Sequence, residues 1–228
     1  PALFASIPAD TPYVLASAEA IPLEAFTTIK RASEVVQEKI AETLRERDGR
    51  TEDDRVVEAL LAEMAGKWNV AGFESLGLTT TPRFALYGIG LQPTVFRIEV
   101  KDAPTVLATI ERIAKRADVK LPPMETHEGR KFWRLPSGNN LAVVALVDNQ
   151  FVVGFGPRVG VERSLSLILG SKKPTRNMAD GKALAAVRAK HGFDPYAIAV
   201  VDTRNTANAF LAQAGITATP ACSSELDR

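Results

Sequence analysis

Glycines 154, 156 and 160 form the part of this sequence that comes nearest to a cofactor-binding motif. They lie in the run Gly-Phe-Gly-Pro-Arg-Val-Gly, which follows an expected strand and opens an expected helix, as a dinucleotide-binding loop does. The third glycine comes one residue late for that fingerprint, and Pro157 lacks the backbone amide that would help to bind a phosphate. We interpret the run as a turn with a helix cap and expect no cofactor.

The histidine, serine and cysteine side chains show no spacing typical of a metal or catalytic site. His127 and His191 are the only histidines, and neither has a second histidine or a group of acids near it in sequence. Ser137 lies in an expected turn rather than in the Gly-x-Ser-x-Gly pattern of a nucleophilic serine, and Cys222 has no histidine nearby. The sequence therefore predicts no metal site and no catalytic residue. Because real enzymes also assemble sites from residues far apart in sequence, a hydrolase of that kind stays the alternative.

Basic side chains are unevenly distributed along the chain. Residues 157–190 hold eight basic residues against two acidic ones, whereas the whole chain has a net charge of +1. Such a segment is able to lie against an anionic lipid or polymer, with about 1 kcal/mol for each well-placed cation, although a solvated helical face is the simpler interpretation. No aromatic residues are interleaved with these cations, so we expect no nucleic-acid binding. The candidate basic surface consists of Arg158, Arg163, Lys172, Lys173 and Arg176.

The composition is that of an ordinary globular protein, with 46% apolar and 24% charged residues among 228. The longest apolar run, from Leu141 to Val147, has seven residues, far fewer than the roughly 20 that cross a bilayer. Cys222 is the only cysteine, and whether it pairs with a cysteine beyond Arg228 is left open. Trp133 is bracketed by cations, as in some ligand sites, but a buried core position is the better interpretation.

The elements that would position these side chains fall into three regions of one body. Residues 1–78 predict a strand at 13–17 and then a helical hairpin. Its first helix runs from Pro22 to about Gly49, with an apolar face of Phe26, Ile29, Val36, Ile40 and Leu44. Its second helix begins at Thr51, with Asp54 as the partner in a capping box, and has an apolar stripe of Val56, Val57, Leu60, Leu61 and Met64.

Residues 83–170 predict hairpins and helices in a repeated ββα plan. The first hairpin joins strands at 84–89 and 94–100, and a helix follows that Asp102 caps. A strand at 131–135 precedes the second hairpin, in which Asp148 and Asn149 form the turn between 141–147 and 151–155. Short turns join antiparallel neighbours, so we expect a mainly antiparallel sheet with helices on one face. The helix after the second hairpin is expected to bury Val161, Leu165, Ile168 and Leu169.

Residues 179–214 predict a further helix–strand–helix unit, with its strand at 196–201 and with Ala207, Phe210 and Leu211 facing inward on its last helix. The expected fold class is therefore α+β: a mainly antiparallel sheet from repeated ββα units covered by helices, with an N-terminal helical hairpin. No linker long or polar enough to separate independent domains interrupts the chain, so we expect one body.

Four stretches resemble a family of bacterial cell-envelope proteins, often lipoproteins, built on a domain of unknown function. They are Ile-Pro-Ala-Asp-Thr-Pro-Tyr-Val from Ile7, Phe-Arg-Ile-Glu-Val-Lys-Asp-Ala-Pro from Phe96, Ala-Leu-Val-Asp-Asn-Gln-Phe-Val-Val-Gly from Ala145, and Tyr-Ala-Ile-Ala-Val-Val-Asp from Tyr196. The resemblance implies a removed signal peptide, export to the periplasm or cell surface, and the option of a lipid anchor upstream of Pro1. It carries over no catalytic residue.

Together these observations predict a non-enzymatic extracytoplasmic protein that acts by binding or scaffolding, with an envelope protein, lipid or polymer as its partner. The hydrolase described above is one alternative. The other is a carrier that holds a lipid or peptide between the helical hairpin and the sheet, which would require an apolar cavity of several hundred Å³.

Overall fold

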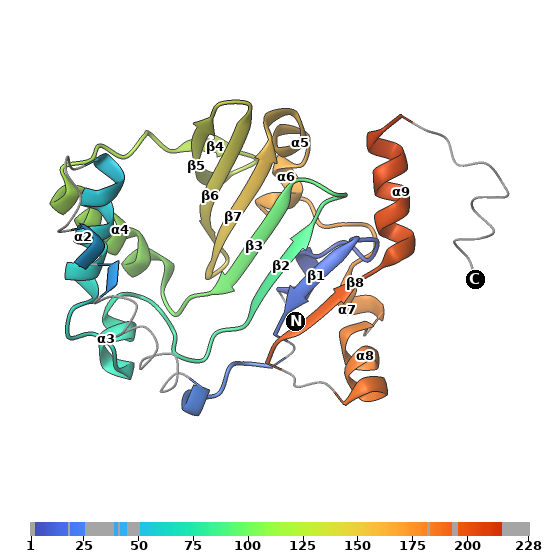
Figure 1. The fold of residues 1–228 in the computed structure, drawn as a ribbon, viewed down its shortest axis with the longest axis horizontal. Coiled ribbons are helices and arrows are strands. Elements are labelled where there is room, and N and C mark those ends of the chain that lie inside the picture. The colour runs from blue at the N-terminus through green and yellow to red at the C-terminus, as the bar shows by residue number, and fades with distance from the viewer. Residues whose placement is uncertain are drawn as a thin grey trace, which may run out of the picture.

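The computed structural model describes residues 3–17, 19–25, 39–40, 42–44, 51–181, 183–192 and 196–215. Their centre is one sheet of eight strands in the order β4-β5-β6-β7-β3-β2-β1-β8, in which every neighbouring pair is antiparallel (Figure 1). The strands are β1 (Tyr13–Ala16), β2 (Phe84–Gly88), β3 (Thr94–Glu99), β4 (Glu125–His127), β5 (Arg130–Ser137), β6 (Asn140–Val147), β7 (Gln150–Pro157) and β8 (Ile198–Val201). The expected α+β class with an antiparallel sheet is confirmed.

The helices begin where the sequence supplies caps. Thr51 and Asp54 form the expected capping box at the start of α2, and the Asp102 carboxylate accepts a hydrogen bond from the Thr105 amide at the start of α4. Helices and turns of helix occur at η1 (Phe4–Ser6), α2 (Glu52–Met64), α3 (Val70–Ser75), α4 (Ala103–Ala117), α5 (Arg158–Arg163), α6 (Leu165–Ile168), α7 (Met178–Gly181), α8 (Ala183–His191) and α9 (Thr203–Gln213).

The hairpin of β6 and β7 forms the longest regular ladder of the sheet. Asp148 and Asn149 join the two strands with φ of 50° and 56°, which is the left-handed geometry that a tight two-residue hairpin turn requires. The two predicted hairpins meet through β3 and β7, which pair from Thr94 opposite Phe155 to Glu99 opposite Gln150. This pairing makes one continuous sheet of the two hairpins.

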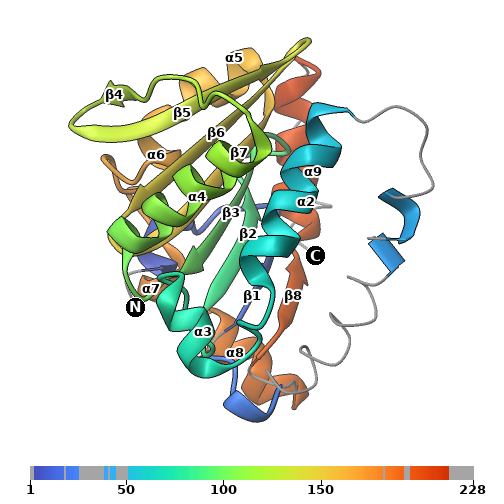
Figure 2. The same ribbon diagram turned by 90° about the vertical axis from the view of Figure 1, so that its left-hand side faces the viewer.

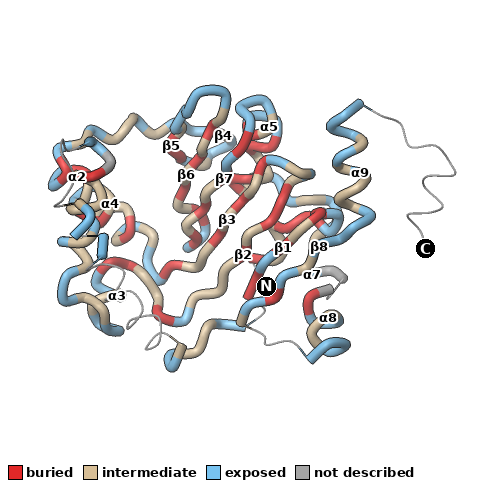
Figure 3. Tube along the Cα trace, viewed as in Figure 1, coloured by how far each residue is buried: buried red, intermediate tan, exposed pale blue. Residues whose placement is uncertain are grey.

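Helices cover both faces of this sheet, so the expectation of helices on one face is wrong (Figure 2). On one face, α6 packs against β7, where Ile168 lies beside Gly154. The main core of the described residues includes Ile168 and extends from there across the sheet to β1 and β8 (Figure 3). On the other face, α4 lies over Ile98 and Phe151, and α2 packs on α4. Because β3 and β7 are antiparallel neighbours, the helices that follow them leave from opposite ends of the sheet.

The repeated ββα plan and the N-terminal helical hairpin are not confirmed. The segment of the predicted first helix, including Phe26, Ile29 and Val36, lies mostly outside the described residues, and Cys222 does also. Within that segment, residues 23–25, 39–40 and 42–44 are helical. The second helix is present as α2, but its described partner is α4.

Two side chains expected to face inward are exposed. Leu60 on α2 is 44% exposed, and the better buried residue of that helix is Ala59. Phe210 on α9 is 63% exposed, because the hydrogen bonds that tie α9 to the sheet come from its first turn. The expected burial of Val161, Leu165, Ile168 and Leu169 is confirmed. Among the described residues, no helix combines the length and the apolarity that crossing a bilayer requires.

Candidate functional site

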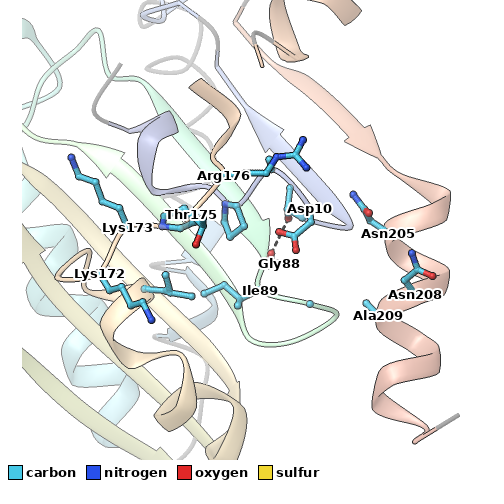
Figure 4. Close-up of a pocket in the computed structure, with 16 residues that line it drawn as sticks. Asp10, Gly88, Ile89, Lys172, Lys173, Thr175, Arg176, Asn205, Asn208 and Ala209 are labelled. Atoms are coloured by element: carbon cyan, nitrogen blue, oxygen red, sulfur yellow. Dashed lines mark hydrogen bonds between the residues drawn. The ribbon is translucent and has the colours of Figure 1, made fainter. Parts of the chain in front are cut away.

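Four separate chain segments contribute to a cleft of about 900 Å³ (Figure 4). Residues 8–11 precede β1, residues 88–90 begin the loop between β2 and β3, residues 172–176 follow α6, and Asn205, Asn208 and Ala209 lie on α9. Lys172, Lys173 and Arg176 line one side of it. We call this site the cationic cleft.

The loop that carries the three cations is fixed to the N-terminal segment by backbone hydrogen bonds. The Ala9 amide donates to the Arg176 carbonyl at 3.0 Å, and the Met178 amide donates to the Ile7 carbonyl at 3.0 Å. Between them, Pro8 and Asn177 form an isolated antiparallel bridge. Residues 176–178 therefore pair with residues 7–9 in the way of a short antiparallel strand. This pairing fixes the position of the loop at 172–176.

The base of the cleft is held by the hydroxyl of Thr11. This hydroxyl bonds the Gly88 carbonyl at 2.8 Å and the Tyr13 carbonyl at 2.9 Å, and the Thr11 side chain is buried. Position 88 requires glycine, since a Cβ atom there would lie 2.4 Å from the Gly90 carbonyl oxygen and 2.8 Å from the Tyr13 ring. The turn before β1 and the loop after β2 thus pack together without an intervening side chain.

The opposite wall, α9, is attached to the same N-terminal segment. The Pro12 carbonyl accepts hydrogen bonds from the Asp202 amide at 2.9 Å and from the Thr206 hydroxyl at 3.2 Å. The Asp202 side chain caps α9 by accepting from the Asn205 amide at 2.8 Å. Asn205 and Asn208 are three residues apart, so they share one face of the helix, and their carboxamides point toward the cleft (Figure 4).

Among the described residues, the side chains that line the cationic cleft carry more positive than negative charge. Lys172, Lys173 and Arg176 are exposed, and none of them forms an ion pair with another described residue. Asp10 is the only acidic residue in the lining, which leaves an excess of two positive charges. Some arginines elsewhere on the described surface do have partners, such as Arg130 with Asp148 at 2.8 Å. Cations in a concave site without carboxylate partners are suited to binding an external anion.

The predicted basic surface is only partly brought together. Lys172, Lys173 and Arg176 line the cleft, whereas Arg158 and Arg163 lie on α5, are exposed and do not line it. The positions of these residues in the sequence could not show which of them line the cleft. That depends on the path of the loop after α6.

Four further lining residues were missed from the sequence: Asp10, Thr11, Asn205 and Asn208. A local signal existed for two of them, since asparagines three apart on a predicted helix share a face. Asp10 and Thr11 belong to a segment that the sequence identified only as a turn, and nothing local indicates that it meets the loop at 172–176.

A second polar cluster brings together residues that are distant in sequence. His127 at the end of β4 has its Nε2 atom 2.8 Å from Oγ of Ser166, which lies on α6. Glu128 Oε2 accepts a hydrogen bond from the Ser171 hydroxyl at 2.6 Å and lies 3.8 Å from the same histidine nitrogen. Hydrogen bonds from the hydroxyls of Ser171 and Ser166 hold the pKa of Glu128 below its ordinary value, and nearby Lys172 acts in the same direction.

This cluster has one feature of a nucleophilic serine site and lacks another. A serine hydroxyl within 2.8 Å of an imidazole nitrogen is the arrangement in which a histidine removes the serine proton. In a complete triad the carboxylate orients the other imidazole nitrogen, whereas Glu128 approaches Nε2 itself. Among the described residues, none forms a hydrogen bond with His127 Nδ1. No described group of three His, Cys, Asp or Glu side chains is placed to hold a metal ion.

The remaining sequence candidates have structural roles. Gly154 and Gly156 lie within β7, where a Cβ atom would come within 2.7 Å of the Ile168 side chain and 3.1 Å of the Pro93 backbone, so these glycines permit close packing. Trp133 is 5% exposed, which confirms the core interpretation. His191 lies in the last turn of α8.

Comparison of the chain with protein-family models, with curated proteins and with solved structures gave no match.

Proposed function

We propose that this chain is a non-enzymatic binding protein of the bacterial envelope and that it binds an anionic ligand in the cationic cleft. The observation that carries the proposal is the set of unpaired cations, Lys172, Lys173 and Arg176, in a cleft of about 900 Å³. Lys172, Lys173 and Arg176 give the cleft a positive potential that Asp10 offsets only in part, and a bound anion would lower that potential. The envelope location is supported by the sequence resemblance described above.

The two walls of the cleft suit different parts of one ligand. The guanidinium of Arg176 and the ammonium groups of the lysines bind phosphate, sulfate or carboxylate oxygens. The carboxamides of Asn205 and Asn208 both donate and accept hydrogen bonds, so they suit the hydroxyl or amide groups of a neutral portion. A polymer that carries anionic groups at intervals presents both kinds of chemistry.

The test is a binding measurement with dextran sulfate as the anionic probe and uncharged dextran as its control. Lys172→Glu, Lys173→Glu and Arg176→Glu together should abolish binding to dextran sulfate. The matched control replaces Arg158, Arg163 and Lys190 by glutamate, which changes net charge equally but leaves the cleft intact. Equal loss in both triple variants would mean that total charge, not the cleft, governs binding.

A hydrolase is the second candidate, and the contact between His127 and Ser166 is the observation that favours it. If the pair is reactive, a fluorophosphonate probe should modify Ser166, and both Ser166→Ala and His127→Ala should prevent the modification. The matched control is Ser171→Ala, since Ser171 belongs to the same cluster but does not contact the imidazole. Absence of modification in the intact protein would leave the binding function as the single candidate.

A further inference from the structure

The second cavity of the molecule lies on the opposite face of the sheet from the main core. It is a groove of about 340 Å³ between α2, α3 and α4 on one side and β3 and β7 on the other. We call it the apolar groove. Its walls include Phe73 of α3, Ile110 and Ile113 of α4, Ile98 of β3 and Phe151 of β7.

The walls of the groove are apolar but are not packed as a core. Ile98, Ile110, Ile113 and Phe151 all remain partly accessible to solvent, in contrast to the main core on the other face. Exposed apolar surface that is continuous and concave is uncommon in a folded protein and is typical of a ligand site. A volume of about 340 Å³ falls in the range of small-molecule sites.

Charge is confined to the rim. Glu63 of α2 lines the groove and is bound by Lys67 at 2.9 Å and by Arg112 of α4 at 3.0 Å. These two cations do not line the groove themselves, but with Glu63 they form a group beside it that has one positive charge in excess. The hydrogen bonds from Lys67 and Arg112 hold the pKa of Glu63 below its ordinary value, so this carboxylate stays charged at neutral pH. Glu99, the other acid in the lining, is neutralised by Arg83, whose Nε lies 2.9 Å from its Oε1.

We infer that the apolar groove binds a fatty acid, with the aliphatic chain between α4 and the sheet and the carboxylate at the rim beside Arg112 and Lys67. The apolar walls exclude a strongly polar ligand, because they offer few hydrogen-bond partners. The excess positive charge of the rim selects an anionic headgroup over a neutral or cationic one. This site is separate from the cationic cleft, and its occupancy does not depend on the function proposed for that cleft.

The experiment is a calorimetric titration of the full chain with octanoate, decanoate and dodecanoate. Burial of each additional methylene should tighten binding by about fourfold until the groove is filled. Ile110→Trp, which places a large side chain in the groove, should weaken dodecanoate binding by at least tenfold. Leu60→Trp serves as a second blocking variant, since Leu60 lines the groove yet is 44% exposed and tolerates replacement.

Val159→Trp is the matched control, because Val159 lies on α5 and is 67% exposed, away from the groove. The Val159→Trp variant should bind dodecanoate with the affinity of the unmodified chain. The triple glutamate variant of the cationic cleft should also bind dodecanoate with that affinity. Arg112→Gln should reduce the preference for decanoate over decyltrimethylammonium. Failure of the intact chain to bind dodecanoate saturably would overturn the inference. Binding that ignores chain length, or that survives both blocking variants, would also overturn it.

Discussion

Replacement of Arg97 by methionine tests how the structure holds the loop that carries the cleft lysines. Arg97 lies on β3 and is 2% exposed, and its guanidinium forms no ion pair with a carboxylate of the described residues. Instead it donates to the Tyr87 hydroxyl at 3.0 Å, to Gln150 Oε1 at 3.1 Å and to the Ile168 carbonyl at 2.6 Å. It also donates to the carbonyl of Leu167, which lines the cationic cleft.

The magnitude follows from the acceptors that would be left without a donor. Gln150 Oε1 and the Ile168 carbonyl have no other donor among the described residues, whereas the Leu167 carbonyl keeps the Gly170 amide at 3.2 Å. Each orphaned buried acceptor costs about 1–3 kcal/mol. Methionine removes the cost of burying a charge, which offsets part of this loss. We therefore expect Arg97→Met to lower the free energy of unfolding by about 3 kcal/mol.

The measurement is urea unfolding monitored by circular dichroism. The slope of the unfolding free energy against urea concentration is compared between the variants, because an unchanged slope shows that only stability has changed. Arg83→Met is the control. Arg83 directly precedes β2, but unlike Arg97 it is partly exposed and forms an ion pair with Glu99. Arg83→Met should lower the free energy of unfolding by less than about 1 kcal/mol. Arg97→Met should also weaken dextran sulfate binding, since the loop after α6 loses its anchor. A loss no larger than that of Arg83→Met would refute the assignment of Arg97 as an anchor.

Three further perturbations have defined outcomes. Gly154→Ala should destabilise by about 1–3 kcal/mol in urea unfolding, because the new Cβ would lie 2.7 Å from Ile168, whereas Gly160→Ala, with its nearest contact at 3.6 Å, should be tolerated. Thr51→Ala removes the capping box of α2 and should cost about 1 kcal/mol in the same assay, and a cost near zero would contradict the cap. The lowered pKa of Glu63 means that its stabilising effect is present above about pH 4.5 and is lost as pH falls through the folded-state pKa. The difference in urea midpoint between pH 7 and pH 3 should therefore be smaller in Glu63→Gln than in the unmodified chain, and an equal difference would contradict the assignment.

Features set by neighbouring residues were predictable from the sequence. Asp148 and Asn149 tolerate left-handed backbone, so the two-residue turn between β6 and β7 was evident without knowledge of the rest of the fold. The capping box at Thr51 was evident for the same reason, since donor and acceptor are three residues apart.

Features set by distant residues were not predictable. The pairing of β3 with β7 joins residues that are more than fifty positions apart, and no local pattern distinguishes it from other antiparallel pairings. The two faces of the sheet depend on that pairing, because it decides which way α4 and α5 leave the sheet. For the same reason, the sequence identified the lysines and Arg176 but not the Asp10 and Asn205 that complete the cationic cleft.

The strand β3 places the two proposed sites on opposite sides of one rigid element. Side chains alternate along a strand, so Arg97 faces α6 and the loop of the cationic cleft while Ile98 faces the apolar groove. Coupling between the sites would require an element with two discrete arrangements, and β3 is hydrogen-bonded on both sides, to β2 and to β7. We therefore expect the two ligands to bind independently. Dodecanoate should leave the affinity for dextran sulfate unchanged, and a shift in that affinity would show that the sheet or the helices α2 to α4 move when the groove is filled.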